Sequence, residues 1–383
     1  MINRTKKTGF LIIIILLCFP VFQEIFKPIS SKPLNGYFEA VKRPLISVGN
    51  VFNGNFRDEM NIYSENSIPF RPDLVRLYNQ IDFSAFGIPH AAKIVVGKGN
   101  YLFEESYIKA YLGNDYIGNQ KIEARVRQFK ELQDLLWDKK KIHLLVIFAP
   151  DKGSFYPEYI PERYLKSGQD TTNYKWYKQE LEKAGINFID FNYWFLKMKD
   201  TSRFLLYPKT GIHWSSYGAF LAMDSLVHYF KNRFEISMPE PVLDSLEISN
   251  VSRDWDADIN QALNLIWNIP HPSLAYPHFH YKKPGNEQKP AALFIGDSFY
   301  FCWSEARFIK NSFRNEEFWY YDHDVYIDRI KQKVTVSNLN FEQTLDRQNV
   351  IVFLQTNAGY GNAGYWFVDR ALALLNDQTK GGK

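Results

Sequence analysis

Short runs of almost uninterrupted apolar residues recur along the chain, and stretches with the periodicity of an amphipathic helix separate them. The apolar runs span residues 143–148, 187–191, 291–295, 317–321 and 350–354. The helical stretches span residues 122–136, 174–184, 216–230 and 366–375. Strands that are apolar on both faces belong in a mostly parallel sheet that helices cover on either side. The sequence therefore predicts an α/β fold.

The N-terminus carries a different pattern. Arg4, Lys6 and Lys7 precede an unbroken apolar run over residues 10–19, which residues 20–22 extend. A cationic segment followed by a short apolar one is typical of an export signal. Because no small-residue cleavage motif follows, we expect an uncleaved signal anchor rather than a cleaved signal peptide. The protein would then be a single-pass protein of the cell inner membrane, with its body on the periplasmic side.

Composition divides the chain into three regions. Residues 1–29 form the expected signal anchor or transmembrane segment. Residues 30–90 form a connector rich in Pro, Gly and Asn, followed by a helical arm, and residues 91–383 form the α/β domain. Within that domain, residues 233–290 are rich in Pro, Trp, His and Asn and interrupt the alternation of strands and helices. We expect them to form an insertion over one edge of the sheet.

The overall composition excludes several classes of function. The formal net charge is only +4 and no long basic run follows the first few residues, which argues against a nucleic-acid partner. Two cysteines in 383 residues exclude a disulfide scaffold and a Cys-rich zinc module. Aromatic residues reach 17%, which suits a protein that presents rings to sugars, although we expect most of these rings in the core.

Two clusters resemble metal ligands without completing a site. Three acids alternate like the start of a calcium loop, and three histidines follow further on: Asp254, Asp256, Asp258, His271, His278 and His280. The glycine that should follow the third acid is replaced by Ile259, and no zinc-type spacing presents the histidines. We therefore expect a surface loop here, with no metal and no other cofactor.

The strongest local signal for chemistry is an apolar strand that runs directly into Gly296, Asp297, Ser298 and Phe299. Ligands bind at the carboxyl ends of the strands in an α/β sheet. A serine on such a strand-to-helix turn exposes its hydroxyl, and the backbone amides around it can stabilise an oxyanion. The same residues also suit an ordinary helix N-cap, so the turn alone leaves both interpretations open.

A serine nucleophile needs a base. His213 is the best candidate, because it lies in a turn just before a helical stretch and has Trp214 beside it. The other histidines lie on a predicted strand, within a predicted helix or in the loops described above. We expect His213 and Ser298 to meet at the carboxyl edge of the sheet, although 85 residues separate them in the sequence.

Five short segments occur in the order typical of one known family. They begin at Ile68, Val96, Ala149, Thr210 and Ile295 and consist of IPFR, VGKGNYLF, APDKGSFYPE, TGIHWS and IGDSF. From about residue 53 to the end, the chain resembles the SGNH hydrolase-like domain of the alginate O-acetyltransferase AlgJ/AlgX family. The resemblance implies an SGNH-like three-layer sandwich with the nucleophile at Ser298 and the base at His213. The histidine precedes the serine, which is the reverse of the order in ordinary SGNH esterases.

One position departs from the pattern of that family, which has an aspartate two residues before the histidine. Here the position is Gly211. The acid of a triad orients the imidazole, and its loss in a serine protease costs about 10⁴ in rate. The acids that follow predicted strand ends are candidates for a replacement: Asp151, Asp190, Asp322 and Asp324. We expect instead that only a carbonyl or water fills the position, so that Gly211→Asp would raise the rate of serine acylation.

The resemblance implies an O-acetyltransferase that places acetyl groups on hydroxyls of an exported polysaccharide through an acetyl-serine. It also implies a partner, a membrane-bound O-acyltransferase (MBOAT), which passes the acetyl groups across the membrane. The same Ser298 and His213 would equally serve a carbohydrate esterase. Gly211 leaves open a third function, that of a catalytically weak scaffold that binds glycans.

Overall fold

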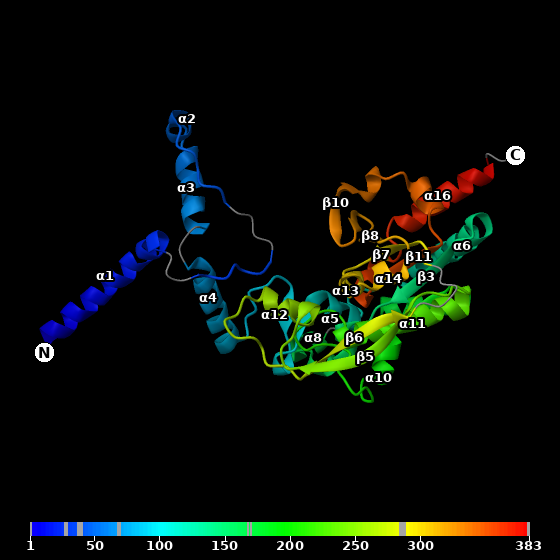
Figure 1. Ribbon diagram of the computed structural model, residues 1–383, viewed down its shortest axis with the longest axis horizontal. Helices are drawn as coiled ribbons and strands as arrows, with labels where there is room; N and C mark the ends of the chain where they lie inside the picture. Colours follow the sequence, from blue (N-terminus) through cyan, green and yellow to red (C-terminus); the bar gives the residue numbers. More distant parts are fainter. Residues whose placement is uncertain are drawn as a thin grey trace. The chain divides into compact units, whose positions relative to one another are not determined.

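The computed structural model describes residues 2–26, 30–36, 41–66, 70–166, 168, 171–282 and 289–380. The chain forms two compact units (Figure 1). The first comprises residues 1–92 and 260–268, and the second comprises residues 93–259 and 269–383. Ser298 and His213 both belong to the second unit.

The first unit is helical. Its helices are α1 (Ile2–Phe26), α2 (Val48–Phe52), α3 (Asn55–Asn66) and α4 (Arg71–Phe86). Pro72 lies in the first turn of α4, where its missing N–H breaks no helical hydrogen bond. Two buried amides of α4 hold the segment 260–268. Asn79 donates to the carbonyl of Leu263 (2.8 Å), and Gln80 accepts from the N–H of Trp267 (3.1 Å).

The apolar run near the N-terminus is helical and forms part of α1. None of the helices in the described ranges combines the length and the apolarity that crossing a membrane requires. Residues 27–29, which the sequence assigns to the end of a signal anchor, lie outside the described residues.

The second unit is built on a seven-stranded sheet in the order β10-β9-β8-β7-β11-β3-β4. In chain order the strands are β3 (His143–Phe148), β4 (Phe188–Asp190), β7 (Ala292–Gly296), β8 (Glu317–Tyr320), β9 (Asp324–Ile327), β10 (Ile330–Thr335) and β11 (Val350–Gln355). The five strands from β8 to β4 are parallel, and β9 and β10 add an antiparallel edge. Val350 pairs with both His143 and Ala292, so the three central strands begin at the same level. The mostly parallel sheet predicted from the sequence is confirmed.

Helices cover both faces of this sheet, as the alternation of strands and helices predicts (Figure 1). Leu145 and Ile147 of β3 pack into one apolar cluster with α5 (Glu105–Tyr111), α10 (Phe191–Met198), α11 (Ser216–Phe234), α13 (Phe299–Glu305) and α14 (Phe308–Ser312). Leu144 and Val146 face the other cluster, with α6 (Asn119–Lys140), α9 (Asn173–Ala184) and α16 (Phe367–Lys380). Successive residues of a strand therefore point alternately into the two apolar layers, one on each face of the sheet.

Shorter elements complete the unit. They are β1 (Ile94–Val96), η1 (Lys98–Asn100), β2 (Leu102–Glu104), α7 (Lys152–Phe155), η2 (Pro157–Tyr159), α8 (Glu162–Leu165), η4 (Val336–Asn338), α15 (Phe341–Asp346) and η5 (Asn357–Asn362). Local sequence explains where the larger helices stop and start. The Thr172 hydroxyl accepts the N–H of Lys175 (3.2 Å) at the start of α9, and Gly185 ends the helix in the left-handed conformation (φ 65°).

The insertion predicted over residues 233–290 contains a long antiparallel ribbon, formed by β5 (Glu240–Ser249) and β6 (Leu274–Lys282). Between these strands lie η3 (Asp254–Ala257) and α12 (Asp258–Ala262). The ribbon lies along α11, where the rings of Phe220 and Phe279 are 5.2 Å apart (Figure 1). The surface loop expected for the histidines is therefore wrong for His278 and His280, which lie on β6. The prolines and histidines of this region are typical of loops, so the sequence did not predict these two strands. The strands are stabilised by pairing with each other.

Candidate active site

Ser298 lies directly after the carboxyl end of β7, at the first turn of α13. Gly296, the last residue of β7, makes this turn possible, because a β-carbon at that position would come within 1.9 Å of the Leu354 carbonyl oxygen on β11. The backbone of β7 thus passes closer to its neighbour than any side chain permits. The serine hydroxyl emerges at the edge of the sheet where a ligand is expected.

Asp297 holds the turn together rather than facing a ligand. Its buried carboxylate accepts the N–H of Phe299 (3.1 Å) and the N–H of Thr356 (2.7 Å), while its own N–H donates to the Leu354 carbonyl (3.1 Å). Burial raises the pKa of this carboxyl, and these backbone donors oppose the rise. The amides of Asp297 and Phe299 are therefore already engaged and do not serve an oxyanion.

The Ser298 N–H makes no hydrogen bond within the described part of the chain. It lies at the N-terminus of α13, beside the hydroxyl that would carry an acyl group. Of the amides that the sequence suggested around the nucleophile, this one is placed to donate to a developing oxyanion.

His213 lies in the loop before α11. Ser215 begins that helix: its hydroxyl oxygen accepts the N–H of Gly218 (2.9 Å), and the hydroxyl donates to the Leu205 carbonyl (2.6 Å). Trp214 is fully buried next to His213 and packs its ring at 5.2 Å from that of Phe299. The two residues that follow His213, a buried tryptophan and a helix-capping serine, thus hold its loop in place.

The two residues that the sequence predicted to meet are hydrogen-bonded. His213 Nε2 lies 2.8 Å from Ser298 Oγ. The His213 ring also packs against Phe299, with ring centroids 4.9 Å apart, and only 12% of its side chain is exposed. The predicted proximity of the two side chains is therefore confirmed.

The second nitrogen of His213 faces a carboxylate. His213 Nδ1 lies 2.6 Å from Asp258 Oδ2 at the start of α12. Asp258 Oδ1 accepts the backbone N–H groups of Ile212 (2.9 Å) and Ile259 (2.7 Å), which fix the carboxylate. Because a carboxylate can only accept, the proton of a neutral imidazole is on Nδ1, and the lone pair of Nε2 faces the serine hydroxyl. The expectation that only a carbonyl or water would fill this place is wrong.

The acids proposed from strand ends have other partners. Asp151 is fully buried and caps α7 by accepting the N–H of Ser154 (2.8 Å). Burial raises its pKa to about 7. Asp190 caps α10 through the N–H of Tyr193 (2.8 Å) and pairs with Lys178 (2.7 Å). Both are structural caps at the ends of β3 and β4.

The other two proposed acids belong to the antiparallel edge of the sheet. Asp322 pairs with Arg370 of α16 at 2.6 Å, and burial raises its pKa to about 6. Asp324 contacts Lys331 and His323. None of the four proposed acids is hydrogen-bonded to His213, so all four are wrong as orienting acids.

Gly211 shows why the acid comes from elsewhere. A β-carbon on Gly211 would approach the carbonyl oxygen of Trp255 to 2.6 Å and the carbonyl group of Asp256 to 2.9 Å. The insertion segment that carries Asp258 therefore passes through the space where a side chain at position 211 would begin. The alternation of Asp254, Asp256 and Asp258 was visible in the sequence, but it resembled an incomplete calcium loop and indicated a surface loop rather than the source of a triad acid.

Asp256 anchors the same segment. It is fully buried and accepts the N–H (3.2 Å) and the hydroxyl (2.9 Å) of Ser216, in the first turn of α11. Burial raises the pKa of Asp256 to about 7. The Trp255 indole donates to the Trp214 carbonyl (3.0 Å). These contacts hold the insertion against the His213 loop and so position Asp258. No group of three or more potential ligands in the described ranges is arranged to hold a metal.

A fully buried lysine lies beneath the His213 loop. The Lys152 ammonium donates to the carbonyls of Lys209 (2.9 Å) and Gly211 (2.5 Å), and no ion pair links it to a carboxylate of the described residues. Burial lowers its pKa to about 7, and Asp258 opposes the shift. Lys152 therefore fixes the carbonyls four and two residues before His213.

A pocket of about 350 Å³ lies beside the segment that leads to Asp258. The segment before Asp258 contributes Arg253, Asp254 and Trp255 to its wall, and Glu305 at the end of α13 contributes from the opposite side. Burial raises the pKa of Glu305, Asp254 adds to the rise, and His213 is among the charges that oppose it. The pocket is thus within electrostatic reach of the candidate base. Its lining contains both aromatic rings and charged or polar groups.

A serine, a histidine and an aspartate linked in series at the carboxyl edge of a mostly parallel sheet define an α/β protein of the serine hydrolase and acyltransferase type. Residues 94–299, more than half of the chain, match the family of the SGNH hydrolase-like domain of the acetyltransferase AlgX, and the chain belongs to this family. It is therefore an enzyme of the SGNH-like O-acyltransferase type.

Solved structures similar to this chain include the O-acetyltransferase domain of Pseudomonas putida AlgJ, with 13% identity and a TM-score of 0.48 over 74% of this chain and 99% of that one. Pseudomonas aeruginosa AlgX is 17% identical, with a TM-score of 0.42 over 72% and 66%. Bacillus cereus PatB1 with a sulfonyl adduct is 13% identical, with a TM-score of 0.43 over 70% and 97%. Comparison with curated protein sequences finds no match.

Proposed function

We propose that the protein acetylates hydroxyl groups of a polysaccharide and carries the acetyl group on Ser298 during transfer. The observation that carries this proposal is the linear arrangement of Asp258, His213 and Ser298, with hydrogen-bond distances of 2.6 Å and 2.8 Å. It supplies a nucleophile, a general base in the correct tautomer and a fixed negative charge for the imidazolium.

In the first half-reaction, His213 Nε2 takes the proton of Ser298 as Oγ attacks the carbonyl carbon of an acetyl ester. The Ser298 N–H donates to the oxyanion of the tetrahedral intermediate. The intermediate then collapses, the bond to the donor oxygen breaks, and the imidazolium returns its proton to that leaving oxygen. Asp258 stabilises the imidazolium while it exists.

In the second half-reaction, a sugar hydroxyl replaces the donor. It gives its proton to His213 and attacks the acetyl carbon, and Ser298 Oγ leaves and recovers the proton. The pocket beside the segment that leads to Asp258, with Trp255 and Tyr276 among its lining, is suited to hold the acceptor sugar, because rings stack on sugar faces and charged groups bind hydroxyls.

We further propose where the reaction takes place and with which partner. The cationic residues before the apolar run of α1 support export and retention at the inner membrane, with the second unit on the periplasmic side. A membrane-bound O-acyltransferase would then supply the acetyl groups from the cytoplasmic side. Fractionation of cells into soluble and membrane fractions, with the N-terminus of the mature protein determined, tests the anchoring.

Intact mass spectrometry tests the central proposal. The full-length protein is exposed to 4-nitrophenyl acetate and its mass is followed with time. We expect one acetyl group to be added to the wild type and none to Ser298→Ala. Ser304→Ala is the matched control, because Ser304 lies on the same helix α13 and is buried away from His213. An acetyl group on Ser298→Ala, or none on the wild type, would refute an acetyl-serine.

A second measurement separates transfer from hydrolysis. The decay of the acetyl-enzyme is followed with and without an oligosaccharide, and the sugar product is analysed for acetyl groups. A transferase forms an acetylated sugar and turns over faster in its presence. Decay that releases only acetate, at one rate with every oligosaccharide tried, identifies a carbohydrate esterase instead.

A further inference from the structure

A groove crosses the edge of the sheet opposite the triad. It consists of two adjoining pockets of about 220 Å³ and 560 Å³, which share Trp137 and His143; we call it the amino-edge groove. His143 is the first residue of β3, and Pro290 and Asn349 precede β7 and β11. The triad lies at the other end of these strands, at least about 15 Å away, because five residues of a strand span that length.

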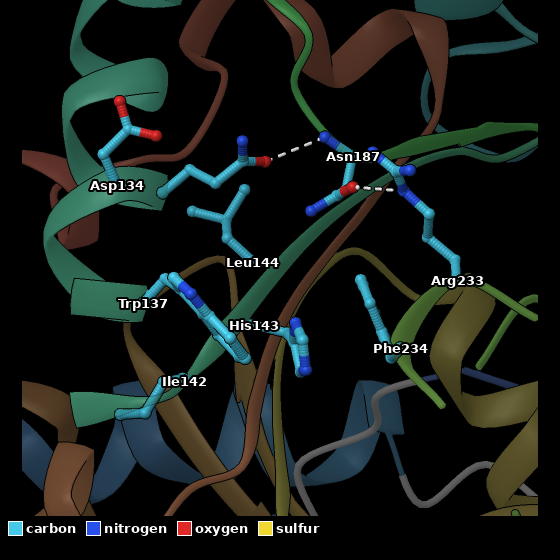
Figure 2. Close-up of a pocket in the computed structure, with 9 residues that line it drawn as sticks. Asp134, Trp137, Ile142, His143, Leu144, Asn187, Arg233 and Phe234 are labelled. Atoms are coloured by element: carbon cyan, nitrogen blue, oxygen red, sulfur yellow. Dashed lines mark hydrogen bonds between the residues drawn. The ribbon is translucent and has the colours of Figure 1, made fainter. Parts of the chain in front are cut away.

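Three aromatic rings in contact line the groove. His143 lies between Trp137, at 4.6 Å between ring centroids, and Phe234, at 4.1 Å and nearly parallel (Figure 2). Burial lowers the pKa of His143, which keeps the imidazole neutral at neutral pH. Trp137 is 44% exposed, so a large aromatic surface remains open to solvent. The half-exposed Trp137 ring therefore offers a surface on which a flat apolar face can stack.

Cations surround these rings. Lys141, Lys289 and Arg314 line the larger pocket, which has no carboxylate in its lining, and no ion pair occupies any of the three within the described ranges. The Lys141 ammonium lies 5.1 Å from the centre of the Trp137 ring. The Arg314 guanidinium makes, within the described residues, only a long hydrogen bond of 3.4 Å to Asn349 Oδ1, while the Arg314 backbone N–H donates to the Pro290 carbonyl (3.0 Å). Among the residues that the structure describes, these three positive charges have no counter-charge, and such a cluster favours an anionic ligand.

The smaller pocket adds polar groups in fixed positions. The Asn187 side-chain oxygen accepts the Arg233 Nε–H (3.1 Å), and the Asn187 N–H donates to Gln133 (2.8 Å), as Figure 2 shows. Its one carboxylate, Asp134, is already paired with Lys130 at 2.6 Å. Lys141 and Arg233 lie at helix C-termini, where a cation is favourable in any case. Lys289 and Arg314 lie outside any last helical turn, so that explanation does not cover them.

We propose that the amino-edge groove binds an acidic saccharide, with one sugar ring stacked on Trp137 and its carboxylate held by Lys289 and Arg314. This inference rests on the proposed function in one respect, namely that the natural ligand is the polysaccharide acceptor. A chain long enough to reach both edges of the domain would bind at the groove and the triad together, and so more tightly than a short one.

Binding of an oligogalacturonate to the full-length protein tests the groove, with a neutral malto-oligosaccharide of equal length as the reference ligand. Isothermal titration at low salt should detect the acidic oligomer and not the neutral one. Lys289→Ala combined with Arg314→Ala should weaken binding by about tenfold or more, because two charged hydrogen bonds are lost. Trp137→Ala should weaken it as well, since the stacking surface is removed.

The matched control combines Lys121→Ala with Lys333→Ala, which removes two exposed cations outside the groove. We expect this variant to bind like the wild type. Equal losses in both double variants would overturn the proposal, because binding would then follow net charge alone. Preference for vesicles of phosphatidylglycerol, with no binding of the oligomer, would overturn it in favour of a membrane surface.

Acetylation of Ser298 by 4-nitrophenyl acetate distinguishes failure of the groove from failure of the proposed function. The groove variants should acylate at the wild-type rate, because the groove and the triad lie at opposite edges of the sheet. If the oligomer binds and Ser298 is never acetylated, the proposed function fails and the groove stands. If Ser298 is acetylated and the oligomer does not bind, the groove fails and the proposed function stands.

Discussion

Gly211 lies against the backbone of Trp255 so closely that a β-carbon on the glycine would come within 2.6 Å of the tryptophan carbonyl oxygen. The family pattern has an acid at this position, two residues before the histidine. Here the acid is Asp258, three residues beyond Trp255 on the insertion. A side chain at 211 and an acid delivered from the insertion therefore exclude each other.

This exclusion reverses what the sequence suggested for Gly211→Asp. The substitution should slow acylation of Ser298 at least tenfold and destabilise the fold by about 1–3 kcal/mol, because an overpacked site must displace backbone. Acylation with 4-nitrophenyl acetate and urea unfolding measure the two effects. Gly361→Ala is the control, since its β-carbon would meet nothing closer than 3.9 Å. A faster Gly211→Asp enzyme would contradict the assignment of Asp258.

Asp258→Asn tests the orienting acid directly. An amide cannot stabilise the imidazolium and can hold the wrong tautomer, so acylation of Ser298 should fall by about 10³–10⁴. Asp254→Asn is the matched control, because Asp254 is an exposed acid of the same segment and has no bond to His213. Stopped-flow release of 4-nitrophenol gives both rates. Similar rates for the two variants would mean that Asp258 does not act through His213.

Lys152→Met should change how stability depends on pH. Burial lowers the pKa of Lys152 to about 7 from 10.5, so above pH 7 the unfolded chain binds more protons than the folded one. The contribution of Lys152 to the free energy of unfolding therefore rises between about pH 7 and 10.5. We expect the free energy of unfolding of the wild type, relative to that of Lys152→Met, to be larger at about pH 9.5 than at about pH 6, as measured by urea unfolding. A constant difference would show that the lysine stays charged throughout.

Asp256→Asn should have the opposite dependence. Burial raises the pKa of Asp256 to about 7 from 3.8, so the stability that it contributes is complete at low pH and is lost as the pH rises toward 7. Between about pH 4 and pH 8, the stability of the variant should therefore rise relative to that of the wild type, and thermal unfolding at the two pH values measures this difference. Asp254→Asn, which changes an exposed acid of the same segment, is the matched control.

The predicted sheet and the nucleophile followed from local sequence. The apolar runs over residues 144–148, 291–295 and 350–354 are buried because both of their faces are apolar, and the sequence alone shows this. Ser298 followed from the turn after β7. The ribbon of β5 and β6 did not, because its strands mix prolines, histidines and acids and are stabilised by each other and by α11.

By itself the sequence determined the order of the five parallel strands and their covering helices, the turn that presents Ser298 and the loop that carries His213. Only the tertiary structure decided which acid faces the histidine, because Asp258 lies 45 positions after His213, with helix α11 and strand β5 between them. Their contact depends on where the insertion returns to the sheet, which long-range packing and the buried bonds of Asp256 determine. The amino-edge groove likewise exists only after folding, since the cations and rings that form it come from segments far apart in the chain.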